Sequence, residues 1–330
     1  MFRKVLLLSL MSFVINTHAA EKINGAGATF PYPIYSKWFS EYQKTNKNVE
    51  FNYQSIGSGG GIKQVLNQTV DFGASDAPMT EAELKQAKTP IHQIPTVLGA
   101  VVVAYNVKGL EKNLKLDGAA IAGIFMGTIS KWNDPMIQKL NPKSQLPATD
   151  ILPVRRSDGS GTTAVFTEFL GGVSADFKSN VGVGKNVNWK AGIGAKGNEG
   201  VTAMVSQTDG AVGYVELAYA INNNLSTAAV LNKAGEYVVA NSASISKAAS
   251  FIKDFSKELT ISTINAEGKG VYPISSFTYL LLPEDKTSSK LKEVRSFLKW
   301  AMKDGQKMAE SLHYAPLPKK MTDAITKKLQ

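Results

Sequence analysis

The residues best suited to chemistry lie in the segment RRSDGSGTT, residues 155–163. Two arginines are followed closely by an aspartate, two glycines and several hydroxyl residues. Glycine lets the backbone approach a ligand, hydroxyl groups donate hydrogen bonds, and arginine presents a permanently charged fork of donors. This combination predicts a cradle for an oxyanion.

Three other short segments have a related composition: GAGATF at 25–30, GSGGG at 57–61 and ASDAP at 74–78. Three of the four segments stand where a helix is expected to begin. Free backbone N–H groups and the positive end of the helix dipole favour an anion there. A single hydroxyl residue at such a place is more often a plain N-cap. Their repetition beside an arginine pair favours a binding site.

The elements that position these segments follow an alternating pattern. Strands are expected at 49–56, 70–74, 94–107, 150–156, 211–216 and 272–282, and helices at 34–43, 61–69, 80–87, 117–127 and 161–171. Thr80 and Glu83 form a capping-box pattern, and an apolar face from Leu291 to Met302 predicts a long helix continuing toward Leu312. This alternation predicts an α/β fold with mostly parallel sheets, and its extent predicts two domains.

Residues 1–20 have the pattern of a secretory signal peptide. Arg3 and Lys4 precede a short apolar core at 5–15, and small residues precede a cleavage site after Ala19 or Ala20. The core is shorter than the roughly 20 residues that a membrane-spanning helix needs. We therefore predict an exported protein.

The chain contains no cysteine, which excludes disulfides and a lipid-modified N-terminal cysteine. An exported protein without a lipid anchor is best retained by an outer membrane, so we expect the periplasm of a Gram-negative cell.

The net charge is +10, and removal of Arg3 and Lys4 lowers it to +8. Because the lysines are scattered, this charge predicts a solvated surface and no nucleic-acid partner.

Several catalytic and cofactor motifs fail on inspection. GAGATF has Phe30 where a dinucleotide fingerprint needs its third glycine, and no Gly-Lys-Ser/Thr closes a P-loop after Gly61. Ser160 lacks the spacing of a nucleophile elbow. His92 and His313 are far apart in the sequence, so we expect structural roles for both and neither a metal site nor a catalytic triad. We expect no cofactor and no enzymatic activity.

Six ordered motifs carry a resemblance to a known family: GAGATFPYPIYSKW, SIGSGGGIKQV, DFGASDAPM, FMGTISKWNDP, VRRSDGSGTT and GAVGYVELAYA. In their order and approximate spacing they resemble the periplasmic phosphate-binding proteins of high-affinity phosphate ABC transporters. The resemblance extends from about Asn24 to Tyr314. It implies a monomer that captures inorganic phosphate and delivers it to the inner-membrane permease subunits.

The resemblance also implies a two-domain periplasmic-binding-protein fold of type II, with mixed, mostly parallel sheets flanked by helices and the ligand in the cleft. The first domain would comprise 21–96 plus 273–330, and the second 97–272. The chain would cross between them twice, and the strands expected at 94–107 and 272–282 fit those crossings. The C-terminal helix would pack back on the first domain.

By the same resemblance, the phosphate ligands are four residues from each domain, with Asp158 holding the Arg156 guanidinium in place. Arg155 is expected to be a neighbour of the site, and Gly59 stands where such proteins often have a second serine. The proposed ligands are Thr29, Phe30 through its backbone N–H, Ser58 and Asp76 from the first domain, and Arg156, Ser160, Gly161 and Thr162 from the second.

An acidic residue among so many donors suits phosphate. An ionised Asp76 can only accept hydrogen bonds, so it accepts from the proton that phosphate keeps at neutral pH and repels sulfate, which has none. Two alternatives remain open. A phosphate cradle could belong to a secreted hydrolase of phosphate esters, and a basic surface could hold polyanions with steep salt dependence.

Overall fold

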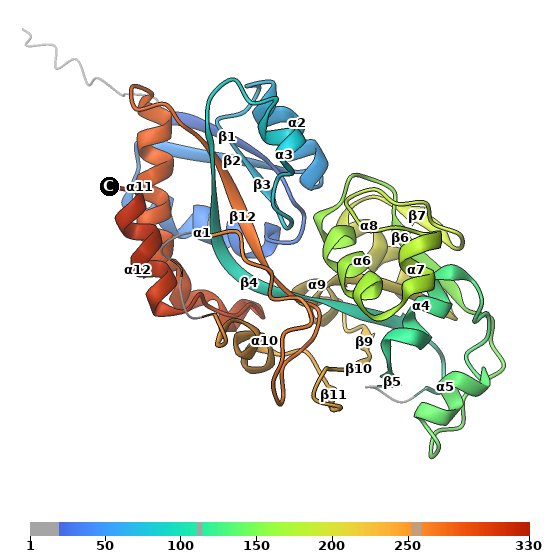
Figure 1. Ribbon diagram of the computed structural model, residues 1–330. Coiled ribbons are helices and arrows are strands. Elements are labelled where there is room, and N and C mark those ends of the chain that lie inside the picture. Colours follow the sequence, from blue (N-terminus) through green and yellow to red (C-terminus); the bar gives the residue numbers. More distant parts are fainter. Residues whose placement is uncertain (1–19, 111–113, 253–254, 256–258) are drawn as a thin grey trace, which may run out of the picture.

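A computed structural model describes residues 20–110, 114–252, 255 and 259–330, so most of the expected signal peptide lies outside the described residues. Its main feature is a mixed sheet with the strand order β2-β1-β3-β12-β4-β8-β6-β7 and β9 paired to β4 (Figure 1). The strands are β1 Glu21–Gly27, β2 Val49–Ser55, β3 Phe72–Ser75, β4 Ile91–Asn106, β6 Leu152–Arg156, β7 Ile193–Ala195, β8 Ala211–Glu216, β9 Ser226–Thr227 and β12 Ser275–Pro283. A small second sheet contains β5 Lys115–Leu116, β10 Ala229–Leu231 and β11 Tyr237–Val238.

Strand β4 joins two halves of the large sheet. Residues 91–100 of β4 pair with β12, and residues 101–106 pair with β8. We call β1, β2, β3, β12 and residues 91–100 the first half, and β6 to β9 with residues 101–106 the second half. Every antiparallel pairing of the large sheet involves β4 or β12, whereas β1–β3 and β6–β8 pair in parallel. The predicted mixed α/β fold is confirmed. The sheet is not mostly parallel as expected, because the long strands β4 and β12 pair antiparallel with their neighbours.

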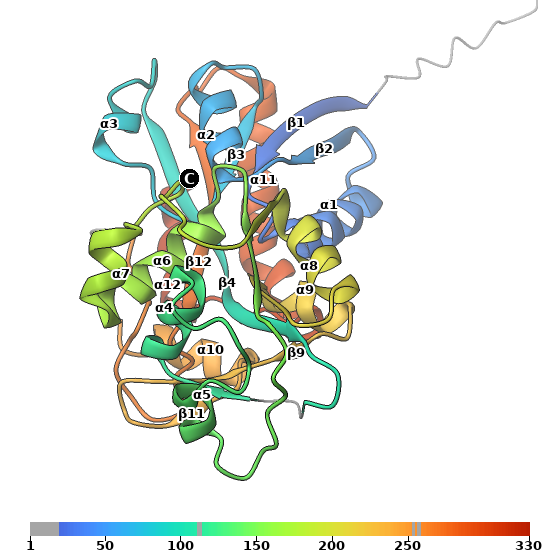
Figure 2. The ribbon, with the colours of Figure 1, turned by 90° about the vertical axis from the view of Figure 1, so that its right-hand side faces the viewer.

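Helices cover both halves of the sheet. Figure 1 shows α11 and α12 beside the first half, and Figure 2 shows α4, α6 and α7 on one side of the second half with α8 and α9 on the other. The helices are α1 Tyr32–Thr45, α2 Ser58–Leu66, α3 Glu81–Leu84, α4 Gly118–Met126, α5 Pro135–Leu140, α6 Gly161–Val173, α7 Ala175–Asn180, α8 Gly197–Gln207, α9 Leu217–Asn222, α10 Ser242–Ala249, α11 Ser289–Lys303 and α12 Lys319–Lys328. Among the described residues, no helix combines the length and the apolar character needed to cross a bilayer.

An aromatic cluster fixes the C-terminal part of the chain to the first half. The Phe297 ring of α11 lies 5.0 Å from Phe39 of α1 and 4.9 Å from Phe51 of β2, measured between ring centroids. All three side chains are buried, and buried aromatic pairs of this kind contribute about 0.5–1.5 kcal/mol beyond the area they bury. The last helices therefore return to the strands that begin the chain.

Several expected helices end earlier than predicted, among them α2, which begins at Ser58 and ends at Leu66 instead of residue 69. The capping box is present, with Glu83 N donating to Thr80 Oγ1 at 3.2 Å, but α3 stops at Leu84. Helix α11 ends at Lys303, and 3₁₀ turns at Gly305–Met308 and Glu310–Leu312 replace its expected continuation. Trp38 Nε1 donates to the Gly305 carbonyl at 2.9 Å, so this carbonyl is held by a tertiary contact that the helical pattern could not predict.

Candidate anion-binding site

The first group of predicted ligands lies at the carboxyl ends of parallel strands. Thr29 and Phe30 follow β1, Ser58 begins α2 just after β2, and Asp76 follows β3 directly. The strand register places Gly27 beside both Ser55 and Ala74, so the three loops emerge at the same edge of the sheet. Because Thr29, Phe30, Ser58 and Asp76 are all buried, we treat them as one unit, the first half-site.

The second group forms a matching unit where β6 runs into α6. Arg156 is the last residue of β6, and Ser160 caps α6 by accepting a hydrogen bond from Thr163 N at 3.0 Å. Gly161 and Thr162 are the first two residues of α6, and backbone N–H groups at that position have no acceptor within the helix. We call the buried residues Arg156, Ser160, Gly161 and Thr162 the second half-site.

The two half-sites meet directly. A β-carbon added to Gly161 would lie 2.3 Å from Ser58 Oγ and 2.6 Å from Asp76 Oδ2. Gly59 N donates to the Gly159 carbonyl at 2.8 Å, which joins the two glycine-containing loops. A β-carbon at Gly59 would come within 3.2 Å of Gly159 Cα, so glycine at this position permits the close approach of the two backbones.

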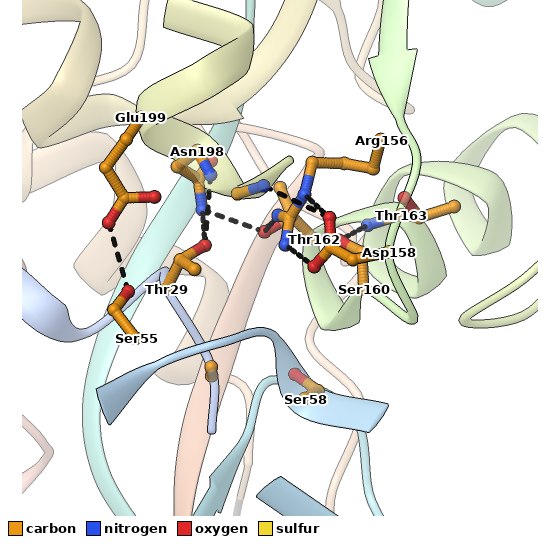
Figure 3. A network of polar contacts seen from close by, with 12 residues as sticks. Thr29, Ser55, Ser58, Arg156, Asp158, Ser160, Thr162, Thr163, Asn198 and Glu199 are labelled. Carbon is orange, nitrogen blue, oxygen red and sulfur yellow. Dashed lines mark hydrogen bonds and ion pairs between the residues drawn. The ribbon is translucent and has the colours of Figure 1, made fainter. Parts of the chain in front are cut away.

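Asp158 holds the Arg156 guanidinium through two hydrogen bonds. Arg156 Nε donates to Asp158 Oδ1 at 2.8 Å, and the terminal nitrogen Nη2 donates to Oδ2 (Figure 3). Although burial alone raises the pKa of Asp158, the hydrogen bond and charge of Arg156 bring that pKa below its ordinary value. Arg156 Nη1 also donates to Thr162 Oγ1 at 3.2 Å. Since a guanidinium has five N–H donors, about two remain for a ligand.

Arg155 is excluded from this cluster by strand geometry. Successive residues of a strand point to opposite faces, and Arg156 is buried whereas Arg155 is only partly buried. The nearest terminal nitrogen of Arg155 lies 3.5 Å from the position that a β-carbon of Gly194 would occupy, on the neighbouring strand β7. Only the second arginine of the pair therefore reaches Thr162 and the half-sites.

Asp76 is the acidic residue at the contact between the two half-sites. Thr278 Oγ1 donates to Asp76 Oδ1 at 2.9 Å, and Ser58 Oγ lies 3.4 Å from Asp76 Oδ2. Burial raises the pKa of Asp76 to about 7, against the opposing effects of the Thr278 hydrogen bond and the Arg156 charge. The carboxyl can therefore hold or release a proton near neutral pH.

Two residues that the sequence did not identify complete the polar network. Thr278 comes from β12, and Asn198 lies in the first turn of α8. The Asn198 side chain donates to Thr29 Oγ1 at 2.7 Å and to Thr162 Oγ1 at 3.1 Å, so it touches both half-sites (Figure 3). The segment around Asn198, KGNEG at 196–200, has the glycine-rich, helix-opening character of the four segments noted above and could have been found by that criterion.

The two histidines among the described residues, His92 and His313, lie outside this network. His92 Nε2 is 3.7 Å from Glu284 Oε2, with both side chains exposed. His313 ends a 3₁₀ turn in the left-handed backbone region. Among the described residues, no cluster of three or more potential metal-ligating side chains is present.

Comparisons with known proteins identify the family of this chain. The family model of the PBP superfamily domain matches residues 15–304. The phosphate-binding protein PstS of Xylella fastidiosa (strain Temecula1) is 45% identical over 311 residues, covering 92% of this chain and 84% of that protein. The phosphate-binding protein PstS of Pasteurella multocida (strain Pm70) is 44% identical over 326 residues, covering 98% of this chain and 94% of the relative.

Solved structures share the fold. A high affinity periplasmic phosphate-binding protein (PfluDING) bound with phosphate superposes with a TM-score of 0.76 at 21% identity, covering 93% of each chain. A phosphate-binding protein from Stenotrophomonas maltophilia gives a TM-score of 0.69 at 21% identity, covering 93% of this chain and 94% of the other. Family model, relatives and fold agree: the chain belongs to the PBP superfamily and, within it, to the family of the phosphate-binding proteins PstS.

Proposed function

We propose that this protein binds inorganic phosphate between its two half-sites and delivers it to the inner-membrane permease of an ABC transporter. The main support for the proposal is the contact between Asp76 and Gly161. It places the Asp76 carboxylate, which accepts hydrogen bonds, next to the N–H and O–H donors of both half-sites. The names of its relatives in the PstS family support the same ligand.

In this proposal each half-site contributes donors to one anion. Thr29, Ser58 and the Phe30 backbone N–H come from the first half-site. The Arg156 guanidinium, the Ser160 and Thr162 hydroxyls and the Gly161 backbone N–H come from the second. Hydrogen bonds that involve an ionised group are worth about 1.5–3 kcal/mol each, so several of them give tight binding.

Asp76 supplies selectivity. Phosphate at neutral pH keeps at least one proton, which Asp76 shares, whereas sulfate offers only bare oxygens to the carboxylate. A buried carboxylate facing a bare oxyanion loses a hydrogen bond and experiences charge repulsion. Because the pKa of Asp76 is about 7, its carboxylate is ionised in the pH range above that value, where it accepts the phosphate proton and repels sulfate.

Delivery requires the site to open and close. We propose that residues 21–96 plus 273–330 and residues 97–272 form two domains that move about β4 and β12. The first boundary falls inside β4, and the second lies two residues before β12. We further propose that residues 1–20 direct export to the periplasm and that the mature protein acts there as a monomer.

We propose binding without catalysis. Both histidines that the structure describes, His92 and His313, lie outside the site, and Ser160 Oγ already accepts the Thr163 N–H as a helix cap. A phosphomonoesterase assay on the purified protein tests this directly. Turnover that disappears in an Arg156→Ala variant would establish the hydrolase alternative.

Isothermal titration with phosphate, arsenate and sulfate tests the ligand. Above the Asp76 pKa of about 7, where the carboxylate is ionised, we expect one site that binds phosphate and arsenate, since both still keep a proton there. Sulfate should bind at least about a hundredfold more weakly, because one charge-assisted hydrogen bond is lost and repulsion is added. Absence of phosphate binding, or equal affinity for sulfate, would overturn the proposal.

A further inference from the structure

We infer that Asn198 is a positioning residue that forces the hydroxyl groups of Thr29 and Thr162 to act only as donors toward the anion. The inference rests on the proposed function, because it concerns how that site recognises the protonation state of phosphate. Thr29 belongs to the first half-site and Thr162 to the second, so one amide sets the direction of hydrogen bonds on both sides of the ligand.

The orientation of the Asn198 amide is determined by its surroundings. The side chain is fully buried, and its Oδ1 accepts a hydrogen bond from Glu216 N at 2.9 Å. A backbone N–H can only donate, so the amide oxygen must face Glu216. The amide nitrogen therefore faces the two threonines, where its two protons serve one hydroxyl each (Figure 3).

Each threonine oxygen then has two donors. Thr29 Oγ1 accepts from Asn198 N at 3.1 Å and from Asn198 Nδ2 at 2.7 Å. Thr162 Oγ1 accepts from Asn198 Nδ2 at 3.1 Å and from Arg156 Nη1 at 3.2 Å. A hydroxyl group has two lone pairs and one proton, so both lone pairs of each oxygen are occupied. What each threonine has left to offer a ligand is its proton.

This arrangement constrains the anion. At both threonines the ligand must present an oxygen without a proton, while Asp76 accepts a proton elsewhere. The doubly charged form of phosphate has one proton and satisfies these conditions. The singly charged form has a second proton, which cannot face Thr29 or Thr162 and must find a place at Ser58 or Ser160. Asn198 therefore favours the doubly charged form.

Other titratable or charged groups surround the amide and its threonines, and they are common to the wild type and to an Asn198 variant. They are Tyr53, Asp76, Arg156, Asp158, Glu199, Glu216, Tyr219 and Tyr314. A comparison between the two proteins consequently isolates the contribution of Asn198.

The test is the pH dependence of phosphate binding in Asn198→Ala. Calorimetric affinities are measured above and below the pH at which phosphate changes from the doubly to the singly charged form. The variant removes one donor from each threonine and frees one lone pair on each. We expect the variant to bind phosphate more weakly at both pH values. We also expect its ratio of high-pH to low-pH affinity to be about three- to tenfold smaller than that of the wild type, which is the factor that the loss of one neutral hydrogen bond gives.

A matched control is Asn141→Ala. Asn141 is also buried and also uses its amide to hold backbone groups, accepting from Lys115 N at 2.9 Å and donating to Ile137 O at 3.0 Å, but it bonds to no half-site residue. Its loss should lower the melting temperature and leave the affinity ratio as in the wild type.

The outcomes are distinguishable. If the wild type binds no phosphate, the proposed function fails. If the wild type binds phosphate and Asn198→Ala keeps the wild-type ratio, or if Asn141→Ala changes the ratio equally, the inference about Asn198 is overturned and phosphate binding stands. If the alanine variant lacks a cooperative melting transition, Asn198→Ser is measured in its place, because serine leaves a smaller void. We expect the same decrease in the affinity ratio, and an unchanged ratio would again overturn the inference.

Discussion

Gly161 packs directly against the Asp76 carboxylate, at a distance that excludes any side chain. A β-carbon at Gly161 would lie 2.6 Å from Asp76 Oδ2 and 2.8 Å from Asp76 Cβ. These two residues are 85 positions apart in the chain and come from opposite half-sites. Their contact brings a helix N-terminus, with its free N–H groups, to Asp76, the one acidic residue of the two half-sites.

Gly161→Ala should therefore weaken phosphate binding by at least about tenfold, because relieving the clash requires the half-sites to separate by an amount that costs more than 1.4 kcal/mol. Gly172→Ala is a matched control in the same helix, since a β-carbon there meets nothing within 4 Å. Titration calorimetry on both variants checks the expectation. Equal affinities would show that the half-sites do not need this contact.

Asp76→Asn should keep phosphate affinity within about tenfold and gain sulfate binding. Thr278 Oγ1 donates to Asp76 Oδ1, so an asparagine would keep its oxygen toward Thr278 and turn its NH₂ group toward the anion. An amide that donates no longer repels a bare oxygen. Calorimetry with sulfate gives the answer, and continued exclusion of sulfate by the variant would mean that Asp76 is not the selective group.

Arg156→Ala should lower phosphate affinity by at least about a hundredfold, because two charge-assisted hydrogen bonds worth about 1.5–3 kcal/mol each are lost. Removal of the guanidinium also leaves Asp158 without its partner, which adds repulsion. Arg155→Ala is the internal control and should change the affinity by less than about threefold, because the Arg155 side chain points toward Gly194 of β7 and not into the half-sites. A comparable loss in the control would place the wrong arginine in the site.

The ligand-free protein should lose stability as the pH rises through the pKa of Asp76. This carboxyl keeps its proton up to about pH 7 when folded, against an ordinary value of 3.8. The folded state therefore binds more protons between these values, and the stabilisation is complete below the lower one and lost above the upper one.

Asp76→Asn removes this titration. The free energy of unfolding of the wild type should fall relative to that of the variant across the same pH interval, by up to a few kcal/mol. Urea denaturation of both proteins at several pH values without phosphate measures the difference. Parallel pH profiles would contradict a raised pKa at Asp76.

Local sequence patterns predicted most of the elements but not all of their ends. The alternation at 49–56 became β2, the β-branched run at 94–107 became most of β4, and Thr80 caps a helix as expected. Helix α11 stops at Lys303, and the Gly305 carbonyl just beyond it accepts a hydrogen bond from Trp38, 267 residues earlier in the chain. Apolar periodicity does not report such a tertiary contact.

Some residues of the site were likewise predicted from the sequence, and others were not. Residue type and a family resemblance identified the eight proposed ligands and the role of Asp158, since glycine, hydroxyl and charged residues at helix starts carry a local signature. Asn198 and Thr278 were missed because each acts through a partner far along the chain: Asn198 through Thr29 and Thr162, and Thr278 through Asp76. The glycine-rich, helix-opening segment around Asn198 is a local signal for a binding loop, but neither an asparagine nor a threonine indicates by itself which distant residue it bonds.

By itself, the sequence determined which side chains are available for the proposed oxyanion site, including one acidic acceptor, and that they lie on an α/β framework. The tertiary structure decided which groups share that cradle. It turned Arg156 inward and left Arg155 outside, brought Gly161 against Asp76, and made Asn198 the common donor to Thr29 and Thr162. Hydrogen bonds act over about 3 Å, so their partners are defined only once the fold has brought distant segments together.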